Sequence, residues 1–278
     1  MIRLSAFADE ISLDLGEQLA VLGSEQIHFL DLRSAWGTNV LDFTDQQIIE
    51  IKQALDEQQV GVAALGSPIG KVAIDTPFTE YLERFERALE IARLLQTSFI
   101  RIFSFYPPAN PSSQREPAAW RDEALRRLRE LTARARAAKI VLLHENEKDI
   151  YGDTIARNVD LLESINDPYF QAAFDPANFI QCEQTPYPDA YEALRPWLRY
   201  VHVKDALATG NVVAAGEGLA RWPELLQRLR TDGYDGFLSL EPHLSAAGQF
   251  QGFSGPALFR HASQSLQNLL RAMNWQYA

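Results

Sequence analysis

Cysteine is nearly absent from this sequence, because Cys182 is the only one among 278 residues. An internal disulfide and a zinc site built on cysteine thiolates are therefore excluded. The sequence also lacks an apolar run of the roughly 20 residues that span a bilayer, and no secretory signal pattern is recognisable. We therefore expect a cytoplasmic protein without a membrane partner.

Positive charge is scarce, since 26 Lys and Arg stand against 37 Asp and Glu, for a net charge of -11. An extended nucleic-acid surface needs a basic stripe, so no nucleic-acid partner is expected. A local cluster of Lys and Arg remains compatible with a small anionic ligand. No Gly-rich phosphate fingerprint follows any strand-like run, which argues against a dinucleotide-binding fold.

Eight strand-like runs alternate with helical segments, and no linker divides the chain, so we expect one domain over residues 1–278. Such alternation implies parallel strand pairing through right-handed crossovers, and eight units favour closure into a (β/α)8 TIM barrel of the α/β class. The expected strands cover residues 2–7, 27–32, 60–65, 99–103, 139–143, 170–174, 200–203 and 237–240. The expected helices cover residues 13–22, 44–58, 78–95, 118–138, 155–164, 188–194, 222–231 and 258–273, and a Pro- and Ser-rich loop covers 107–117.

Four of the expected strands end in a side chain that can bind a metal ion, namely Glu145, Asp175, His202 and Glu241. Each alone has a simpler interpretation: a solvated strand end for either glutamate, a core histidine, and a turn before Pro176 for the aspartate. The C-terminal ends of barrel strands converge on one face, where active sites are built. Three carboxylates and one imidazole therefore predict one divalent ion, of Mn, Mg, Co or Zn, in an open site.

A family resemblance rests on short motifs spread along nearly the whole chain. They are HEN at 144–146, FDPAN at 174–178, HVKDA at 202–206, GEG at 216–218 and SLEPH at 239–243, with ADEIS at 8–12, SPIGK at 67–71 and IRIFSFY at 100–106. The chain resembles the xylose-isomerase-like TIM-barrel superfamily, and within it the sugar phosphate isomerase/epimerase group. These motifs are specific for the fold and the metal site and poorly specific for the substrate.

The resemblance implies that Glu145, Asp175, His202 and Glu241 bind the metal and that the two glutamates also move protons on opposite faces of the substrate. One departure is Asn178, at a position where related epimerases often carry a histidine. Endonuclease IV, another superfamily member, binds three zinc ions through more histidines than the five present here. A nuclease is therefore the weakest of the candidate functions.

Five further residues are predicted to contact the substrate. Lys204 follows His202 by two positions and shares its face, so it binds either a substrate oxygen or phosphate, or else a neighbouring acid. Arg101, inside an apolar strand, needs a partner, which we expect in the barrel mouth. The other predicted substrate contacts are Asn178, Lys71 in the loop after the third strand, and Glu217 of the GEG motif.

The expected function is a metal-dependent isomerase or epimerase of a small sugar or sugar phosphate, acting through an enediolate that the metal stabilises. Two alternatives remain open: a lyase of the inosose dehydratase type on the same metal site, and a sugar-binding barrel without turnover. The sequence leaves the sugar, the native metal and the choice between monomer and homo-oligomer undecided.

Overall fold

Eight parallel strands form one closed barrel in the computed structural model, which describes residues 1–110, 116–244 and 253–278. The strands follow one another around the ring in the order β1, β12, β9, β8, β7, β6, β5 and β2. Their bounds are β1 Arg3–Ala6, β2 Phe29–Leu32, β5 Gly61–Leu65, β6 Phe99–Ile102, β7 Val141–Glu145, β8 Phe170–Phe174, β9 Leu198–Val203 and β12 Phe237–Leu240. The predicted TIM barrel is confirmed, whereas part of the predicted loop at 107–117 lies outside the described residues.

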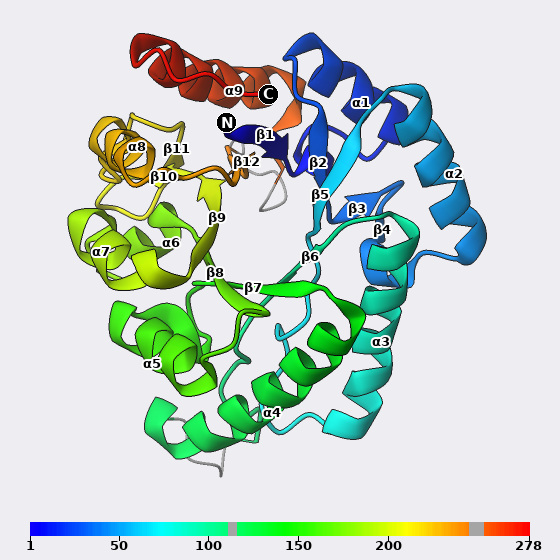
Figure 1. Ribbon diagram of the computed structural model, residues 1–278, viewed down its shortest axis with the longest axis vertical. Helices are drawn as coiled ribbons and strands as arrows, with labels where there is room; N and C mark the ends of the chain where they lie inside the picture. The colour runs from blue at the N-terminus through cyan, green and yellow to red at the C-terminus, as the bar shows by residue number, and fades with distance from the viewer. Residues whose placement is uncertain (111–115, 245–252) are drawn as a thin grey trace.

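Helices surround the barrel, and α9 closes the ring beside α1 (Figure 1). Their bounds are α1 Leu15–Ser24, α2 Asp45–Glu57, α3 Phe78–Leu94, α4 Pro117–Ala138, α5 Ile155–Ile165, α6 Pro176–Gln181, α7 Tyr191–Leu194, α8 Trp222–Thr231 and α9 Gly255–Ala272. The helix predicted at 188–194 is α-helical only in α7, because residues 186–190 form a single π-helical turn in which Tyr187 has an extended backbone conformation. The short helix α6 was not predicted.

The apolar core lies in two places. A large cluster fills the space between the strands and the helices, and a smaller one, which includes Ala63, Leu143, Ala173, Tyr200 and Phe237, fills the barrel interior. The interior is therefore packed with side chains rather than open, as in other barrels of this size.

Two short antiparallel ribbons were not predicted. One joins β3 (Ser34–Ala35) to β4 (Thr38–Asn39), and the other joins β10 (Asp205–Ala206) to β11 (Val212–Val213). They follow β2 and β9 at the C-terminal ends of these strands, so they belong to the rim of the barrel mouth.

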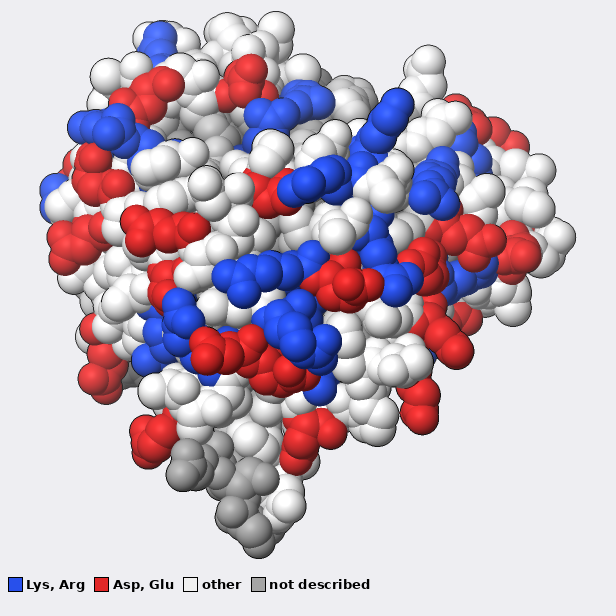
Figure 2. All heavy atoms as spheres, turned by 60° about the horizontal axis from the view of Figure 1, so that its bottom comes forward, with Lys and Arg blue, Asp and Glu red and all other residues white. Residues whose placement is uncertain are grey.

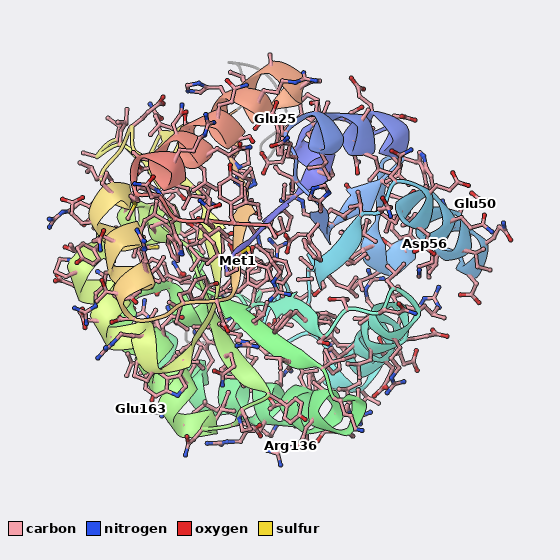
Figure 3. The ribbon with its side chains drawn as sticks, turned by 45° about the horizontal axis from the view of Figure 1, so that its top comes forward. Met1, Glu25, Glu50, Asp56, Arg136 and Glu163 are labelled. Atoms are coloured by element: carbon pink, nitrogen blue, oxygen red, sulfur yellow. The ribbon has the colours of Figure 1, made fainter. Side chains whose placement is uncertain are left out.

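The surface carries both charge signs in close mixture. On the face shown in Figure 2, basic and acidic side chains alternate without a continuous basic stripe. Charged side chains such as Glu50, Asp56 and Arg136 project outward from the helices (Figure 3). Within the described ranges, no helix is long and apolar enough to cross a membrane.

Candidate metal centre

The four predicted ligands meet at the C-terminal ends of four neighbouring strands. Glu145 is the last residue of β7, Asp175 follows β8, His202 lies in β9 and Glu241 follows β12. One ligand atom from each lies within 4.8 Å of the other three, and all four side chains are buried. The structure therefore brings together the complete set predicted from the strand ends.

The donor atoms fit a divalent ion. His202 Nδ1 lies 3.0 Å from Glu145 Oε1 and 3.3 Å from Glu241 Oε2. Within the described part of the chain, this nitrogen and one oxygen of each acid make ion-pair contacts but no hydrogen bond of acceptable geometry. Buried polar atoms without hydrogen bonds are costly, and a bound cation removes this cost. Three carboxylates with one imidazole suit an ion of the Mn, Mg, Co or Zn type.

The surrounding charges support the same conclusion. Two further carboxylates, of Asp9 and Glu10, lie at the mouth beside the three acids of the centre. The permanent cations that face these five acids are Arg33, Arg101 and Lys204. Carboxylates therefore outnumber the permanent cations around the centre, which favours the binding of a further cation.

The pKa values follow from these contacts. Burial lowers the pKa of His202, but Glu145 and Glu241 outweigh this effect and raise it to about 10. Burial raises the pKa of Glu145, but His202 and Arg101 outweigh it and lower the value to about 2. Burial raises the pKa of Asp175 to about 7 against the opposing effect of Lys204. A proton and a metal ion compete for His202 Nδ1, so metal binding should weaken as the pH falls.

Two asparagines orient the acidic ligands. Asn146 donates from Nδ2 to the Asp175 carbonyl oxygen at 2.8 Å and accepts from the Asp175 amide at 2.9 Å. Asn178 donates from Nδ2 to Glu145 Oε1 at 3.3 Å, and its amide donates to Asp175 Oδ1 at 2.9 Å, which caps α6. Asn178 was predicted to contact the substrate; that contact stays a prediction, and the structure shows its amide holding Glu145.

Arg101 and Lys204 both enter the centre. Arg101 Nη1 lies 3.2 Å from Glu145 Oε2 and 3.1 Å from Glu241 Oε1, while Lys204 Nζ lies 2.8 Å from Asp175 Oδ2. Both side chains are almost fully buried. The ion pair of Lys204 with Asp175 agrees with the second interpretation of Lys204, a contact with a neighbouring acid. Both cations also lie within reach of a ligand in the mouth.

Lys71 and Glu217 lie farther out. Lys71 Nζ lies 3.0 Å from Glu147 Oε2 and 4.2 Å from the centroid of the Phe103 ring. Glu217 is half-exposed and accepts a hydrogen bond of 2.8 Å from His261 Nε2 on α9. Neither is in the ligand cluster, and the substrate contacts predicted for them stay predictions.

The two glycines of the GEG motif are explained by their contacts with Asp205. The buried carboxylate of Asp205 accepts hydrogen bonds from the amides of Ala206, Gly216, Gly218 and Ala220 at 2.8 to 3.0 Å. A Cβ at Gly218 would overlap an oxygen of this carboxylate. Asp205 therefore fixes the loop that follows β10 and β11.

Sequence reasoning missed a second layer of polar residues around the centre. Arg33 Nη1 lies 3.0 Å from Glu241 Oε1, and His243 Nε2 lies 3.7 Å from the same oxygen. Below the ligands, Tyr200 and Ser239 donate hydrogen bonds to the buried carboxylate of Asp31. The alternation of side chains along β2 was the available signal, because it places Asp31 and Arg33 on the same inward face.

The chain is similar to a known family over most of its length. A family model for the xylose isomerase-like TIM barrel matches residues 18–269. No curated protein sequence matches the chain significantly.

Solved structures share the whole fold at low sequence identity. A D-tagatose 3-epimerase-like protein has a TM-score of 0.77 and 17% identity, with 98% of each chain covered. D-Psicose 3-epimerase from Clostridium cellulolyticum H10 has a TM-score of 0.76 and 16% identity, with 97% of this chain and 99% of that chain covered. The probable 3-DHS dehydratase AsbF from Bacillus anthracis has a TM-score of 0.73 and 19% identity, with 96% and 99% covered. Since the family model spans most of the sequence, the chain belongs to the xylose isomerase-like TIM barrel family.

Proposed function

We propose that this protein is a divalent-metal-dependent isomerase or epimerase of a small sugar or sugar phosphate. The observation that carries the proposal is the pair Glu145 and Glu241, which approach His202 Nδ1 from two different strands at 3.0 and 3.3 Å. Glu145, Asp175, His202 and Glu241 would hold the ion. When bound, the ion supplies the positive charge that polarises the substrate carbonyl.

The two glutamates perform the proton transfer. The glutamate that is ionised accepts the proton from the carbon next to the carbonyl, and the other glutamate, in its protonated form, donates a proton to the opposite face. Against the effect of burial, His202 lowers the pKa of Glu145, and Lys204 lowers that of Glu241. Arg101 lies within 3.2 Å of both carboxylates and is placed to donate to a substrate oxygen. Lys204 holds Asp175 at 2.8 Å and is the second donor near the substrate position.

The named activities of structural neighbours support this class of reaction without selecting a sugar. Two of them are named as 3-epimerases or 3-epimerase-like, and the third as a probable dehydratase. Isomerisation, epimerisation and dehydration can all begin with removal of a proton next to a carbonyl. The choice between them depends on what leaves or is reprotonated afterwards.

Solvent deuterium exchange tests the proposal. The protein is incubated with Mn²⁺ in heavy water with a panel of ketoses, their phosphates and inososes, and deuterium incorporation is followed by mass spectrometry and NMR. Glu241→Gln keeps the size and one coordinating oxygen but cannot accept a proton. It should slow exchange by about 100-fold to 10,000-fold, as expected for a positioned acid or base.

Controls separate the outcomes. Glu163→Gln, at an exposed position on α5, should exchange at the wild-type rate. Undiminished exchange in Glu241→Gln would assign the base elsewhere, with Lys204 the next candidate. Loss of water from an inosose would identify a dehydratase, and tight sugar binding without exchange or product would identify a sugar-binding barrel.

A further inference from the structure

A second set of ligand-type side chains lies directly beside the centre. Atoms of Glu10, Glu241 and His243 lie within 4.8 Å of one another, and Glu241 is shared with the first set. Glu10 ends the 3-10 helix Ala8–Glu10 that follows β1. His243 adopts a left-handed backbone conformation with φ of 45°, two residues beyond Glu241. Side chains of ligand type do not by themselves make a metal site, so the groups around Glu10, Glu241 and His243 determine whether an ion can bind there.

The guanidinium of Arg33 lies among these three side chains. Its Nη1 is 3.0 Å from Glu241 Oε1 and 3.5 Å from His243 Nε2, and its Nη2 is 3.7 Å from Glu10 Oε1. A guanidinium stays charged at every pH that proteins tolerate. The position that a second metal ion would need is thus filled by a permanent cation of the chain itself.

Arg33 is anchored from the opposite side. Its Nε donates to Asp9 Oδ2 at 2.7 Å, and Ser34 donates to the same oxygen at 2.8 Å. The guanidinium carbon lies 4.9 Å from the centroid of the Phe7 ring, which supplies a cation–π contact. These contacts hold the charged end in place, while 19% of the side chain remains exposed at the mouth.

Glu10 provides an independent indication of a cation position. Its carboxylate is fully buried, and Oε2 accepts hydrogen bonds from the His243 amide at 2.7 Å and from Ser254 at 2.8 Å. Oε1 has no hydrogen-bond partner in the described portion of the structure and faces Arg33 and His243 at 3.7 and 3.3 Å. A buried, unpartnered carboxylate oxygen beside an imidazole is the environment that binds a divalent ion when no other cation is present.

We propose that Arg33 serves as a built-in second cation of the centre. It occupies the position between Glu10, Glu241 and His243, limits the protein to one divalent ion, and presents a second positive charge to the substrate. The charge presented to the substrate rests on the proposed function, whereas the limit to one ion does not. Replacing Arg33 by a neutral residue should therefore create a second metal site.

Metal analysis of four proteins tests this inference. Each is equilibrated with excess Mn²⁺, passed over a desalting column and analysed for Mn by mass spectrometry, and the retained ions are examined by electron paramagnetic resonance. Arg33→Met, which keeps the stem and removes the charge, should retain one more ion than the wild type, with spin coupling between the two. Arg33→Lys keeps a cation and should retain the wild-type number. In Arg33→Met/Glu10→Gln the additional ion should be lost.

Each failure has its own signature. If the wild type binds no ion, the proposed function is contradicted. The inference about Arg33 is then judged by whether Arg33→Met binds an ion that the wild type does not bind. A wild type with one ion and an Arg33→Met variant that gains none overturns the inference, as does a spin-coupled second ion in the wild type. Arg33→Gln, which can still donate to Asp9, replaces Arg33→Met if circular dichroism shows that the latter does not fold.

Discussion

The hydroxyl of Tyr200 donates a hydrogen bond of 2.7 Å to Oδ1 of Asp31, across the barrel interior from β9 to β2. Ser239 donates to the other oxygen of Asp31 at 2.6 Å, and Ser5 lies 3.0 Å from the Tyr200 hydroxyl. All four side chains are buried. Tyr200 and Ser239 each precede a metal-ligand candidate by two residues on the same inward face. This network, called the floor network below, therefore lies directly under His202 and Glu241 in the barrel interior.

Tyr200→Phe should lower the free energy of unfolding by about 1 to 3 kcal/mol, because Asp31 loses a donor while it stays buried. Urea denaturation followed by circular dichroism measures the loss. Tyr277→Phe is the matched control, since that hydroxyl donates at 3.0 Å to Gln267 at a half-buried site, and it should cost less. Equal losses in the two variants would contradict a special role for the floor network.

The stability of the wild type should carry a pH dependence that comes from Asp31. Burial raises the pKa of this carboxyl above its ordinary 3.8, although hydrogen bonds from Ser239 and Tyr200 oppose the rise. The folded state then binds the proton more tightly than the unfolded state. The stability that comes from protonated Asp31 is fully present below the pKa of Asp31 in the unfolded state, and it is lost as the pH rises through its pKa in the folded state.

Asp31→Asn removes this titration. The stability of the variant relative to the wild type should increase with pH over the acid range and level off above the folded pKa of Asp31. Urea denaturation of both proteins from about pH 4 to 8 gives this difference. A difference that stays constant with pH would show that Asp31 has the same pKa in both states.

His202→Ala should weaken Mn²⁺ binding by at least about 100-fold while the barrel remains folded, because residues on the catalytic face contribute more to function than to stability. Isothermal titration measures the affinity, and circular dichroism measures the fold. His261→Ala is the control, since that ring is half-exposed and bonds to Glu217 on the outside. Collapse of the fold would favour a core histidine over a metal ligand.

Asp205→Ala should lower the free energy of unfolding by about 3 kcal/mol, because four backbone amides lose a charged acceptor at once. The loop at 214–220 should also become accessible to proteolysis. Asp189→Ala, at an exposed position, should change stability by less than about 0.5 kcal/mol. A similarly small effect at Asp205 would mean that water replaces the carboxylate at the loop amides.

The barrel and its ligand cluster were predictable because both depend on local pattern. Each strand is a short apolar run, and Glu145, Asp175, His202 and Glu241 stand where these runs end. Whether they bind the metal as predicted awaits measurement, but their convergence follows from the topology. The role of Lys204 in holding Asp175 was among the alternatives that the same alternation suggested.

Arg33, Glu10 and His243 were beyond prediction because their grouping depends on how distant segments meet. Alternation along β2 places Arg33 on the same face as Asp31, but it does not show which other segments reach that face. Glu10 comes from a single helical turn, and His243 from a residue with a left-handed conformation. Neither feature has a periodic pattern.

The four ligand candidates come from β7, β8, β9 and β12, which are neighbours in the ring, whereas β1, β2, β5 and β6 supply none. An ion held in this way joins one half of the barrel into a unit that resists local opening. The loops after β1, β2 and β5 carry Asp9, Glu10, Arg33 and Lys71, and none of these residues is among the four ligand candidates. In the proposed reaction, this half of the mouth is therefore the part that can rearrange around a substrate without loss of a metal ligand.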